Sequence, residues 1–359
     1  MPSRGSALLL PVLVFWLWSA SVSAQNATTS RNDPLALTTA GIYNWVHTSG
    51  DIQAAYEFYN DVFEIDLAPS PFYGDPAVQP TEIRPVSQAG SDALVWDLTN
   101  TAGSRYRSAF LSAPNTAFGL ELVEFLDIPR ESRHANAWDP GTSILIFEVR
   151  DLDAVIERAR AHDAPIVSAG GDAVMTSKGQ AVVMRNPDGY LMQAIQAAPD
   201  VVASAQQPGE VIRTSIGITV ADTDRSLAFY RDLLDWEIGT AAEAADADLR
   251  LYGLRGGTLS LTRMTIPGTA ASVVLHEFDL RPDSTHTANP FEWRIQDINA
   301  PQFQLQVRGL NELLQRTRMA GYRFLSVGGR PIERPFGRFV FVIDPDNVLV
   351  EYVEAADDR

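Results

Sequence analysis

Residues 181–196 read AVVMRNPDGYLMQAIQ, and residues 339–354 read FVFVIDPDNVLVEYVE. Each stretch holds two apolar segments that flank a four-residue turn, at residues 186–189 in the first and residues 344–347 in the second. Asn, Pro, Asp and Gly favour fixed or left-handed backbone angles, so each stretch predicts a β-hairpin. The same hairpin therefore occurs twice in the chain.

The repeat extends well beyond the hairpins. Residues 149–196 align with residues 307–354 without a gap, and the two stretches share serines, arginines and paired glycines. Residues 114–125 (PNTAFGLELVEF) also align without a gap with residues 267–278 (PGTAASVVLHEF). These matches occur in the same order along the chain and indicate an internal duplication.

A strand followed by a helix is predicted near the start of each half. The predicted helix after residue 51 has Asp51 at its start, where a side-chain oxygen can satisfy free N–H groups, and it carries the aromatic pair Phe58-Tyr59. We expect this pair to pin the helix to a sheet. The corresponding residues in the second half are Asp222, Phe229 and Tyr230.

Each half of the chain itself contains two copies of a smaller unit. Residues 144–161 again read as a strand, an aspartate at position 151 and an amphipathic helix, and further strands follow. The repeating unit is therefore a strand, a helix and about three strands, and it occurs four times, which predicts an α+β fold. The predicted boundaries are a first domain at 38–200, a linker at 201–210 around Pro208-Gly209 and a second domain at 211–359.

The first residues predict a secretory signal. Arg4 provides a positive charge, residues 7–18 form an apolar run, and residues 22–24 offer small side chains to a peptidase. The run is shorter than the ~20 residues that span a bilayer, which favours a signal peptide at 1–24 over an uncleaved anchor. We therefore expect an exported protein, periplasmic or secreted, without membrane attachment after cleavage. Residues 25–37 are mostly polar and predict a disordered lead-in.

Composition excludes several classes of function. The chain has 28 basic and 45 acidic residues, for a formal charge of −17. This charge argues against nucleic acid and anionic membranes as partners, because like charges repel. The chain has no cysteine, which excludes disulfides, thiolate zinc sites, iron–sulfur clusters and cysteine nucleophiles.

The fourfold unit resembles the vicinal oxygen chelate (VOC) superfamily, which includes glyoxalase I, fosfomycin and bleomycin resistance proteins and extradiol dioxygenases. The resemblance rests on the helix aspartates with their aromatic pairs and on the two Pro-Asp turns, and it covers residues 40–355. It implies two tandem VOC-like domains, each a pair of βαβββ units that form a curved mixed-sheet cleft. It also implies a small organic molecule as partner and allows a homodimer.

The resemblance further implies that ligands project from the first and last strand of each unit. Carried over by position, each half offers one carboxylate, no histidine and one apolar residue, which is an incomplete set for a catalytic metal. The first half offers Asn44, Glu121, Ile144 and Gln193, and the second offers Ser215, Val274, Gln302 and Glu351.

Three residues are the candidates for catalysis. Glu121 could bind a metal or accept a proton, or it could form a salt bridge with Arg105 or Arg107. His276 follows Val274 by two residues and shares its face of a strand, so it could pair with Glu351 as acid and base, or be a hydrogen-bonded structural histidine. The candidate catalytic residues are Glu121, His276 and Glu351, the candidate metal ligands are Glu121, Gln193 and Glu351, and the candidate ligand-binding residues are Asn44, Gln193, Ser215 and Gln302.

These observations lead to two hypotheses about function. The first is an exported glyoxalase/bleomycin-resistance-like protein that binds a small organic molecule in a sheet-lined cleft without a catalytic metal. The alternative is a VOC-type lyase, isomerase or dioxygenase, with or without a divalent Mn, Fe, Ni or Zn ion. Because the candidate ligands differ between the halves, we expect that at most one cleft retains chemistry.

Overall fold

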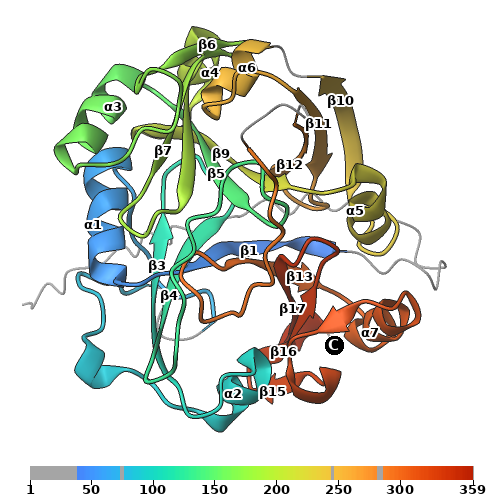
Figure 1. The fold of residues 1–359 in the computed structure, drawn as a ribbon. Helices are drawn as coiled ribbons and strands as arrows, with labels where there is room; N and C mark the ends of the chain where they lie inside the picture. Colours follow the sequence, from blue (N-terminus) through green and yellow to red (C-terminus); the bar gives the residue numbers. More distant parts are fainter. Residues whose placement is uncertain (1–38, 73–76, 244–245, 281–285, 359) are drawn as a thin grey trace, which may run out of the picture. The chain divides into compact units, whose positions relative to one another are not determined.

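The computed structural model describes residues 39–72, 77–243, 246–280 and 286–358. The described residues form one compact unit (Figure 1). The predicted signal peptide and lead-in lie outside the described residues. Among the helices that are described, none is both long enough and apolar enough to cross a membrane.

The first βαβββ unit precedes residue 127 and carries an additional helix between its second and third strands. Its elements are β1 (Thr39–Thr48), α1 (Ile52–Phe63), β2 (Asp66–Leu67), the 3₁₀ turn η1 (Val86–Gln88), α2 (Ala93–Thr99), β3 (Arg105–Ser112) and β4 (Gly119–Leu126). The second unit has no counterpart of α2. Its elements are β5 (Ser143–Val149), α3 (Leu152–Ala161), β6 (Val174–Thr176), β7 (Gly179–Arg185) and β8 (Leu191–Gln196).

The short helix α4 (Pro199–Ser204) leads to the second half, which repeats the pattern. The third unit has β9 (Val211–Thr219), α5 (Thr223–Tyr230), β10 (Glu237–Glu243), α6 (Asp246–Leu251), β11 (Thr258–Thr265) and β12 (Ser272–Asp279). The fourth has β13 (Pro301–Val307), α7 (Leu310–Met319), β14 (Arg323–Phe324), η2 (Val327–Gly329), β15 (Ile332–Arg334), β16 (Gly337–Ile343), β17 (Leu349–Ala355) and η3 (Ala356–Asp358). The predicted α+β architecture of four βαβββ units is confirmed.

The helices begin as their sequences predict. The carboxylate of Asp51 accepts the backbone N–H of Gln53, 3.0 Å away, and Asp222 accepts that of Arg225 at the same distance. These side chains satisfy N–H groups that have no partner within the helix. The aromatic pairs are also confirmed as anchors, because Phe58, Tyr59, Phe229 and Tyr230 are fully buried in the core.

The strands form two mixed sheets, and the order of the strands shows which units share a sheet. One sheet runs β14-β16-β17-β13-β1-β4-β3-β2, with β15 paired to β16, and combines the first unit with the fourth. The other runs β10-β11-β12-β9-β5-β8-β7-β6 and combines the second unit with the third. Each sheet is therefore built from both halves of the sequence.

Antiparallel pairs of first strands join the units within each sheet. In the first sheet β1 pairs with β13, so that Asn44 lies opposite Gln304. In the second sheet β5 pairs with β9, so that Ile146 lies opposite Ser215. The candidate residues were grouped by half in the sequence analysis, and this grouping is wrong because the first strand of each unit pairs with a unit of the other half.

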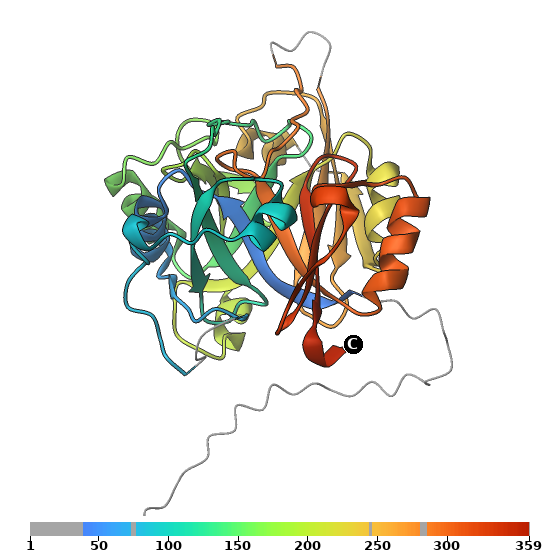
Figure 2. The ribbon, with the colours of Figure 1, turned by 90° about the horizontal axis from the view of Figure 1, so that it is seen from below.

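Units that follow each other in the sequence are joined by their helices and hairpins instead. Arg158 of α3 donates through Nε to the carbonyl of Val62 in α1, 3.0 Å away. In the other half Arg316 of α7 donates to the carbonyl of Leu233, also at 3.0 Å. Figure 2 shows α1 (blue) beside α3 (green) on one side of the strands, and α5 (yellow) beside α7 (orange) on the other.

Candidate active site in the first cleft

The sheet of the first and fourth units encloses a cavity of about 380 Å³, which we call the first cleft. This volume is within the range typical of small-molecule sites. Its lining comes from β1, β3 and β4 of the first unit, from β13, β15, β16 and β17 of the fourth, and from α2. Figure 1 shows α2 next to β15 and β16 at the lower edge of the molecule.

Two carboxylates from different halves of the chain meet at the floor of this cleft. Glu121 on β4 and Glu351 on β17 both line the cavity and are buried. Between their strands, Gln304 on β13 donates through Nε2 to Oε2 of Glu121, 2.8 Å away. No described arginine, lysine or histidine forms an ion pair with either carboxylate.

Asn44 holds the Gln304 amide at this floor in place. Its Nδ2 donates to Oε1 of Gln304, 2.7 Å away, which fixes the orientation of the Gln304 amide. The position of Asn44 requires a glycine on the neighbouring strand, because a Cβ on Gly119 would lie 2.4 Å from Oδ1 of Asn44. Asn44 itself does not line the cavity, whereas Gln302 does and donates to the hydroxyl of Thr48.

The electrostatics of the floor favour protonation of both carboxyl groups. Burial raises the pKa of Glu121 from 4.5 to about 7, against a lowering by the hydrogen bond from Gln304. Burial, and then the nearby charge of Glu121, raise the pKa of Glu351 to about 8. Near neutral pH the pair therefore holds a proton.

The walls of the first cleft are apolar and largely aromatic. Phe336 lies at the mouth and is partly exposed, while Phe339 and Phe341 on the adjoining β16 are buried. Aliphatic residues such as Val95, Leu98 and Ile332 complete the wall. The six phenylalanines that line the cavity are Phe72, Phe110, Phe125, Phe336, Phe339 and Phe341.

A serine hydroxyl holds α2 over the first cleft. Ser326 donates to the carbonyl of Leu98, 2.8 Å away, and accepts the backbone N–H of Phe341 at the same distance. The second sheet repeats this arrangement, since Ser168 donates to the carbonyl of Leu251 at 2.9 Å and accepts the N–H of Val183 at 2.7 Å. These equivalent contacts place α6 over a second cleft, formed by the second and third units.

The second cleft is filled by its own side chains. Tyr252 follows Leu251 and occupies the position that Thr99 holds in the first cleft. The Tyr252 ring packs at 5.8 Å from His276 and 5.4 Å from Phe278, measured between ring centroids. Its hydroxyl donates to Oε1 of Gln193, 3.4 Å away. The space that remains is about 60 Å³, enough for a few water molecules and too small for the ligands of typical pockets.

Three of the predicted site residues lie in this second cleft. Gln193, Ser215 and His276 all line the remaining space. His276 packs against Gly217, where a Cβ would lie 2.8 Å from the ring. Burial lowers the pKa of His276 to about 3, so the ring is neutral near pH 7.

Two predicted combinations are therefore wrong. The pair of His276 with Glu351 does not form, because His276 lies in the second sheet and Glu351 in the first. The metal set of Glu121, Gln193 and Glu351 is split in the same way, since Gln193 is on β8. The physical reason is the pairing of β1 with β13 and of β5 with β9, which separates units that are adjacent in the sequence.

The alternative interpretation of Glu121 as a salt-bridge partner is also wrong. Arg107 pairs with Glu124 on the opposite face of β4, with 2.6 Å between Nε and Oε2. Arg105 pairs with Asp127, again at 2.6 Å. Both arginines are thus occupied, and Glu121 faces the cavity.

Gln304 is the floor residue that the sequence analysis missed. It lies two residues after Gln302 and therefore on the same face of β13, so period-two alternation could have suggested it. The walls were harder to find, because Thr99 and Phe336 belong to segments outside the strands that the resemblance specifies. Among the described residues, no group of three or more His, Cys, Asp or Glu side chains could hold a metal ion, so any cation at this floor would also need amide oxygens.

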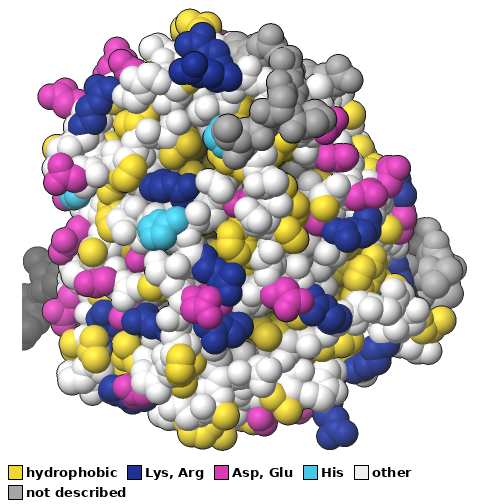
Figure 3. Space-filling view, viewed as in Figure 1, with side chains coloured by type: hydrophobic (Ala, Val, Ile, Leu, Met, Phe, Trp, Pro, Cys, Tyr) yellow, Lys and Arg dark blue, Asp and Glu magenta, His cyan; other side chains and the backbone are white. Residues whose placement is uncertain are grey.

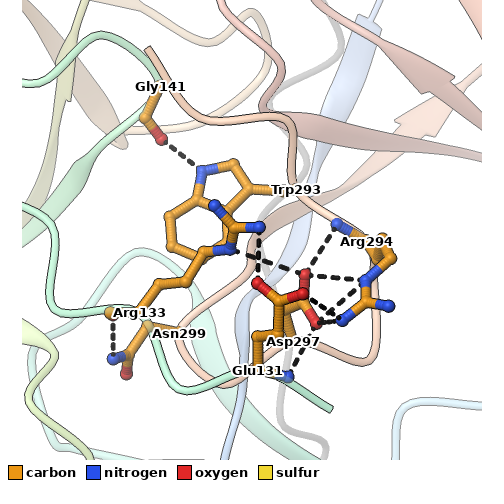
Figure 4. A network of polar contacts seen from close by, with 7 residues as sticks. All are labelled: Glu131, Arg133, Gly141, Trp293, Arg294, Asp297 and Asn299. Carbon is orange, nitrogen blue, oxygen red and sulfur yellow. Dashed lines mark hydrogen bonds and ion pairs between the residues drawn. The ribbon is translucent and has the colours of Figure 1, made fainter. Parts of the chain in front are cut away.

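A separate hollow with several charged residues lies where the segments between β4 and β5 and between β12 and β13 meet. Its volume is about 360 Å³. Figure 3 shows acidic and basic side chains side by side in the middle of this face. Figure 4 shows the network of polar contacts at this hollow, in which buried Asp297 binds Nη2 of Arg294 at 2.5 Å and lies 3.8 Å from Nε of Arg133. Arg133 also pairs with Glu131, so this network ties the two segments together.

Comparison with known protein families agrees with the geometry. The family model described as Glyoxalase/Bleomycin resistance protein/Dioxygenase superfamily matches residues 44–194 and 213–352. The chain belongs to this superfamily. The two matched ranges correspond to the two halves of the internal repeat, which confirms the predicted family. No curated protein matches the chain.

Solved structures from the superfamily share the fold over most of the chain. A point variant of glyoxalase I from Zea mays has a TM-score of 0.56 and 17% sequence identity, with 88% of this chain and 93% of that chain covered. Glyoxalase I from Zea mays has a TM-score of 0.55 and 16% identity, with 88% and 92% covered. At this identity the similarity shows the fold of the superfamily and leaves the reaction open.

Proposed function

We propose that the chain is an enzyme that binds a small organic molecule in the first cleft and moves a proton on it, as lyases and isomerases do. The observation that carries this proposal is the pair Glu121 and Glu351, two buried carboxylates that meet at the floor of an apolar cavity. Their pKa values of about 7 and about 8 suit general acid–base catalysis near neutral pH. The second cleft serves as scaffold.

The floor also fits a divalent cation. Two ionised carboxylates without a cationic partner repel each other, and Glu121 and Glu351 would hold a cation that removes this cost. The amide of Gln304 lies next to Glu121 through its Nε2, so its Oε1, which now accepts from Asn44, would have to turn toward a cation to complete an all-oxygen set. An all-oxygen set suits Mn²⁺ better than Zn²⁺, Ni²⁺ or Fe²⁺, which favour nitrogen or sulfur ligands. When bound, such an ion would polarise a ligand oxygen.

The protein's own residues account for the remaining steps. Glu121 and Glu351 face the cavity, so one carboxylate can accept a proton from the ligand while the protonated partner donates one. Gln304 orients Glu121, and Asn44 orients Gln304. The phenylalanine walls exclude water, which strengthens electrostatic interactions at the floor.

A metal-free binding protein is the second candidate, and one observation favours it. The Gln304 amide donates to Glu121, so it already satisfies part of the carboxylate's need for a partner. In this alternative the carboxyl pair shares a proton and forms hydrogen bonds with a ligand. The two candidates differ in whether a cation binds at the floor.

Calorimetric titration of the chelator-treated protein with Mn²⁺ separates them. We expect one ion per chain, with affinity lowered about 100-fold in Glu121→Gln and in Glu351→Gln, a loss at the upper end of that expected for groups supporting a metal site. Asp248→Asn is the matched control, because Asp248 is a buried carboxylate of the second cleft. Its affinity should equal that of the original chain.

Two outcomes would contradict binding of a cation at the floor of the first cleft. Absence of binding, or equal binding by Glu351→Gln, would leave the metal-free alternative. Turnover assays with aliphatic and aryl ketones and hydroxy ketones then decide between enzyme and binder, because only an enzyme exchanges their α-hydrogens with D₂O. Loss of this exchange in Glu351→Gln is the result expected from the proposed proton transfer.

We also propose that the protein is exported, on the basis of the signal-like residues 1–24. Sequencing the N-terminus of the protein from its native compartment tests this. A mature chain that starts near residue 25 supports export, and a chain that keeps Met1 contradicts it.

A further inference from the structure

We propose that the first cleft selects an uncharged, hydrophobic molecule with a ring system of about bicyclic size, and that it discriminates against anions of the same shape. This inference rests on the proposed function only in taking the first cleft as the functional site. It adds the chemical class of the ligand, which neither the superfamily nor the carboxylate pair specifies.

The walls provide the first argument. Six phenylalanines line one cavity and come from strands of two units, from the segment after β2 and from the turn between β15 and β16. Phe72, Phe336 and Phe339 form a continuous aromatic surface at the mouth, with centroid distances of 5.5–6.4 Å between each pair. Flat aromatic faces stack well on rings, which favours a ring over an aliphatic chain.

The second cleft provides an internal reference for what the fold itself requires. Strand registers identify the equivalent residues: Phe110 faces Glu121 across β3 and β4, and Arg263 faces Val274 across β11 and β12. Likewise, Phe336 precedes the start of β16, and Lys178 precedes the start of β7. The same fold thus tolerates an arginine and a lysine where the first cleft has phenylalanines, so folding alone does not impose the aromatic lining.

Charge provides the third argument. Among the described residues, Arg334 is the one basic residue that lines the first cleft. Its Nη2 lies 2.6 Å from Oδ2 of Asp92, so its charge is neutralised at the mouth. At the floor Glu121 and Glu351 are neutral or negative and offer an anion no positive charge. An anionic ligand therefore meets no free positive charge in the first cleft.

Thr99 leaves the space in the first cleft that a ring system needs. This buried residue lines the first cleft, whereas its equivalent Tyr252 fills the second. The two cavities differ accordingly, with about 380 Å³ in the first cleft and about 60 Å³ in the second. A tyrosine at position 99 would therefore occupy the space that a ring system needs.

Binding of three probes tests the ligand class. Calorimetry of the full chain at pH 7 with 2-naphthol, 2-naphthalenesulfonate and glucose compares an uncharged ring, an anionic ring and an uncharged polar molecule. We expect 2-naphthol to bind once per chain and at least about tenfold more tightly than the sulfonate, a difference of about 1.4 kcal/mol. We expect no binding of glucose. Equal or tighter binding of the sulfonate, or tighter binding of glucose, overturns the proposal.

Two variants locate the binding in the first cleft. Thr99→Tyr should abolish binding of 2-naphthol, and Tyr252→Thr, the reciprocal change, should leave it unchanged. Because Thr99→Tyr changes a buried position, Phe336→Lys at the mouth is the second variant, with Lys178→Phe as its control. We expect about tenfold weaker 2-naphthol binding in Phe336→Lys alone. Unchanged binding in a correctly folded Thr99→Tyr or in Phe336→Lys contradicts the proposal.

The two proposals fail in different ways. Binding of 2-naphthol that Thr99→Tyr abolishes, without uptake of Mn²⁺ or α-hydrogen exchange, supports the ligand class and contradicts the enzyme. Uptake of Mn²⁺ at Glu121 and Glu351 without any binding of 2-naphthol overturns the ligand class and leaves the cation site standing.

Discussion

The two clefts of this molecule share the same backbone framework, but one is open and the other is filled by side chains. In both, a helix is held over the sheet by a serine that bridges a helix carbonyl and a strand N–H, Ser326 in the first cleft and Ser168 in the second. The first cleft is open and has two carboxylates at its floor, while the second is filled by Tyr252 and has Gln193 where the first has Glu351. The comparison separates residues that build the frame from residues that build the site.

Residues that repeat between the halves belong to the frame. Arg158 binds a carbonyl in the last turn of α1, Arg316 binds one just after α5, and Ser168 and Ser326 each hold a helix over a cleft. The cavity residues differ between the halves, since Glu121, Glu351 and Thr99 in the first cleft correspond to Val274, Gln193 and Tyr252 in the second. An internal repeat is therefore a guide to architecture, and the departures from it are a guide to function.

The largest expected effect is the loss of stability when the side chain that fills the second cleft is removed. Tyr252→Ala removes a buried aromatic ring that packs on His276 and Phe278, and should lower the free energy of unfolding by about 3–5 kcal/mol. Thr99→Ala at the equivalent position borders an open cavity and should cost less than about 1.5 kcal/mol, because a methyl and a hydroxyl are lost there. Urea denaturation followed by tryptophan fluorescence measures both.

The difference between these variants is the informative quantity. Equal losses would mean that Tyr252 does not fill the second cleft in solution. Tyr252→Phe is the matched control, because it keeps the ring and loses only the 3.4 Å hydrogen bond to Gln193. It should cost about 1 kcal/mol or less.

The next effect concerns pH and the carboxylates of the first cleft. The folded-state pKa of Glu121, about 7, exceeds its ordinary value of 4.5, so the folded protein keeps a proton that the unfolded chain has lost. The contribution of Glu121 to stability should therefore be greatest below pH 4.5. It should fall as the pH rises through about 7 and level off near pH 8. Glu121→Gln removes this dependence and should stabilise the chelator-treated protein by roughly 2–4 kcal/mol at pH 8.5.

A reciprocal variant sharpens this comparison. Gln193→Glu places a carboxylate in the second cleft at the position equivalent to Glu351, and it should destabilise the protein more at pH 8.5 than at pH 5. Thermal unfolding at the two pH values measures both variants. A Glu121→Gln variant that is no more stable than the original chain at pH 8.5 would show that the carboxylate is solvated or paired.

The fold was largely predictable because it depends on local patterns. The helix aspartates, the aromatic pairs and the turns at residues 186–189 and 344–347 all behave as their residue types predict. The pairing of units was not predictable, because every unit offers the free edge of a first strand and the sequence of one strand does not specify its partner. Strand register, such as that of Asn44 with Gln304, is decided by packing over the whole sheet.

The candidate site was predictable only in part for the same reason. Glu121 and Glu351 were found by position, and both line the first cleft. Their proximity depends on the pairing of β1 with β13 and could not be read from the chain. Gln193 and His276 were correctly placed on cleft-facing strands, but they lie in the other sheet.

The smallest expected effect concerns the rim of the first cleft. Asp92 neutralises Arg334 and also caps α2, where its Oδ1 accepts the N–H of Leu94 at 2.9 Å. The bond to Arg334 lowers the pKa of Asp92, so the pair is charged at neutral pH. Asp92→Asn keeps the cap, since asparagine is an equally good N-cap, and removes the charge. Its cost in stability should be below about 1 kcal/mol, because the pair is partly exposed.

This small change should nevertheless alter selectivity at the cleft mouth. Freed from Asp92, Arg334 can attract an anion, so Asp92→Asn should bind 2-naphthalenesulfonate about threefold more tightly while its affinity for 2-naphthol stays constant. Asp232→Asn, which breaks the exposed pair of Arg231 with Asp232, is the matched control and should change neither affinity. If both probes respond equally to Asp92→Asn, the change acts through the position of α2, and the charge of Arg334 then does not determine which ligands enter.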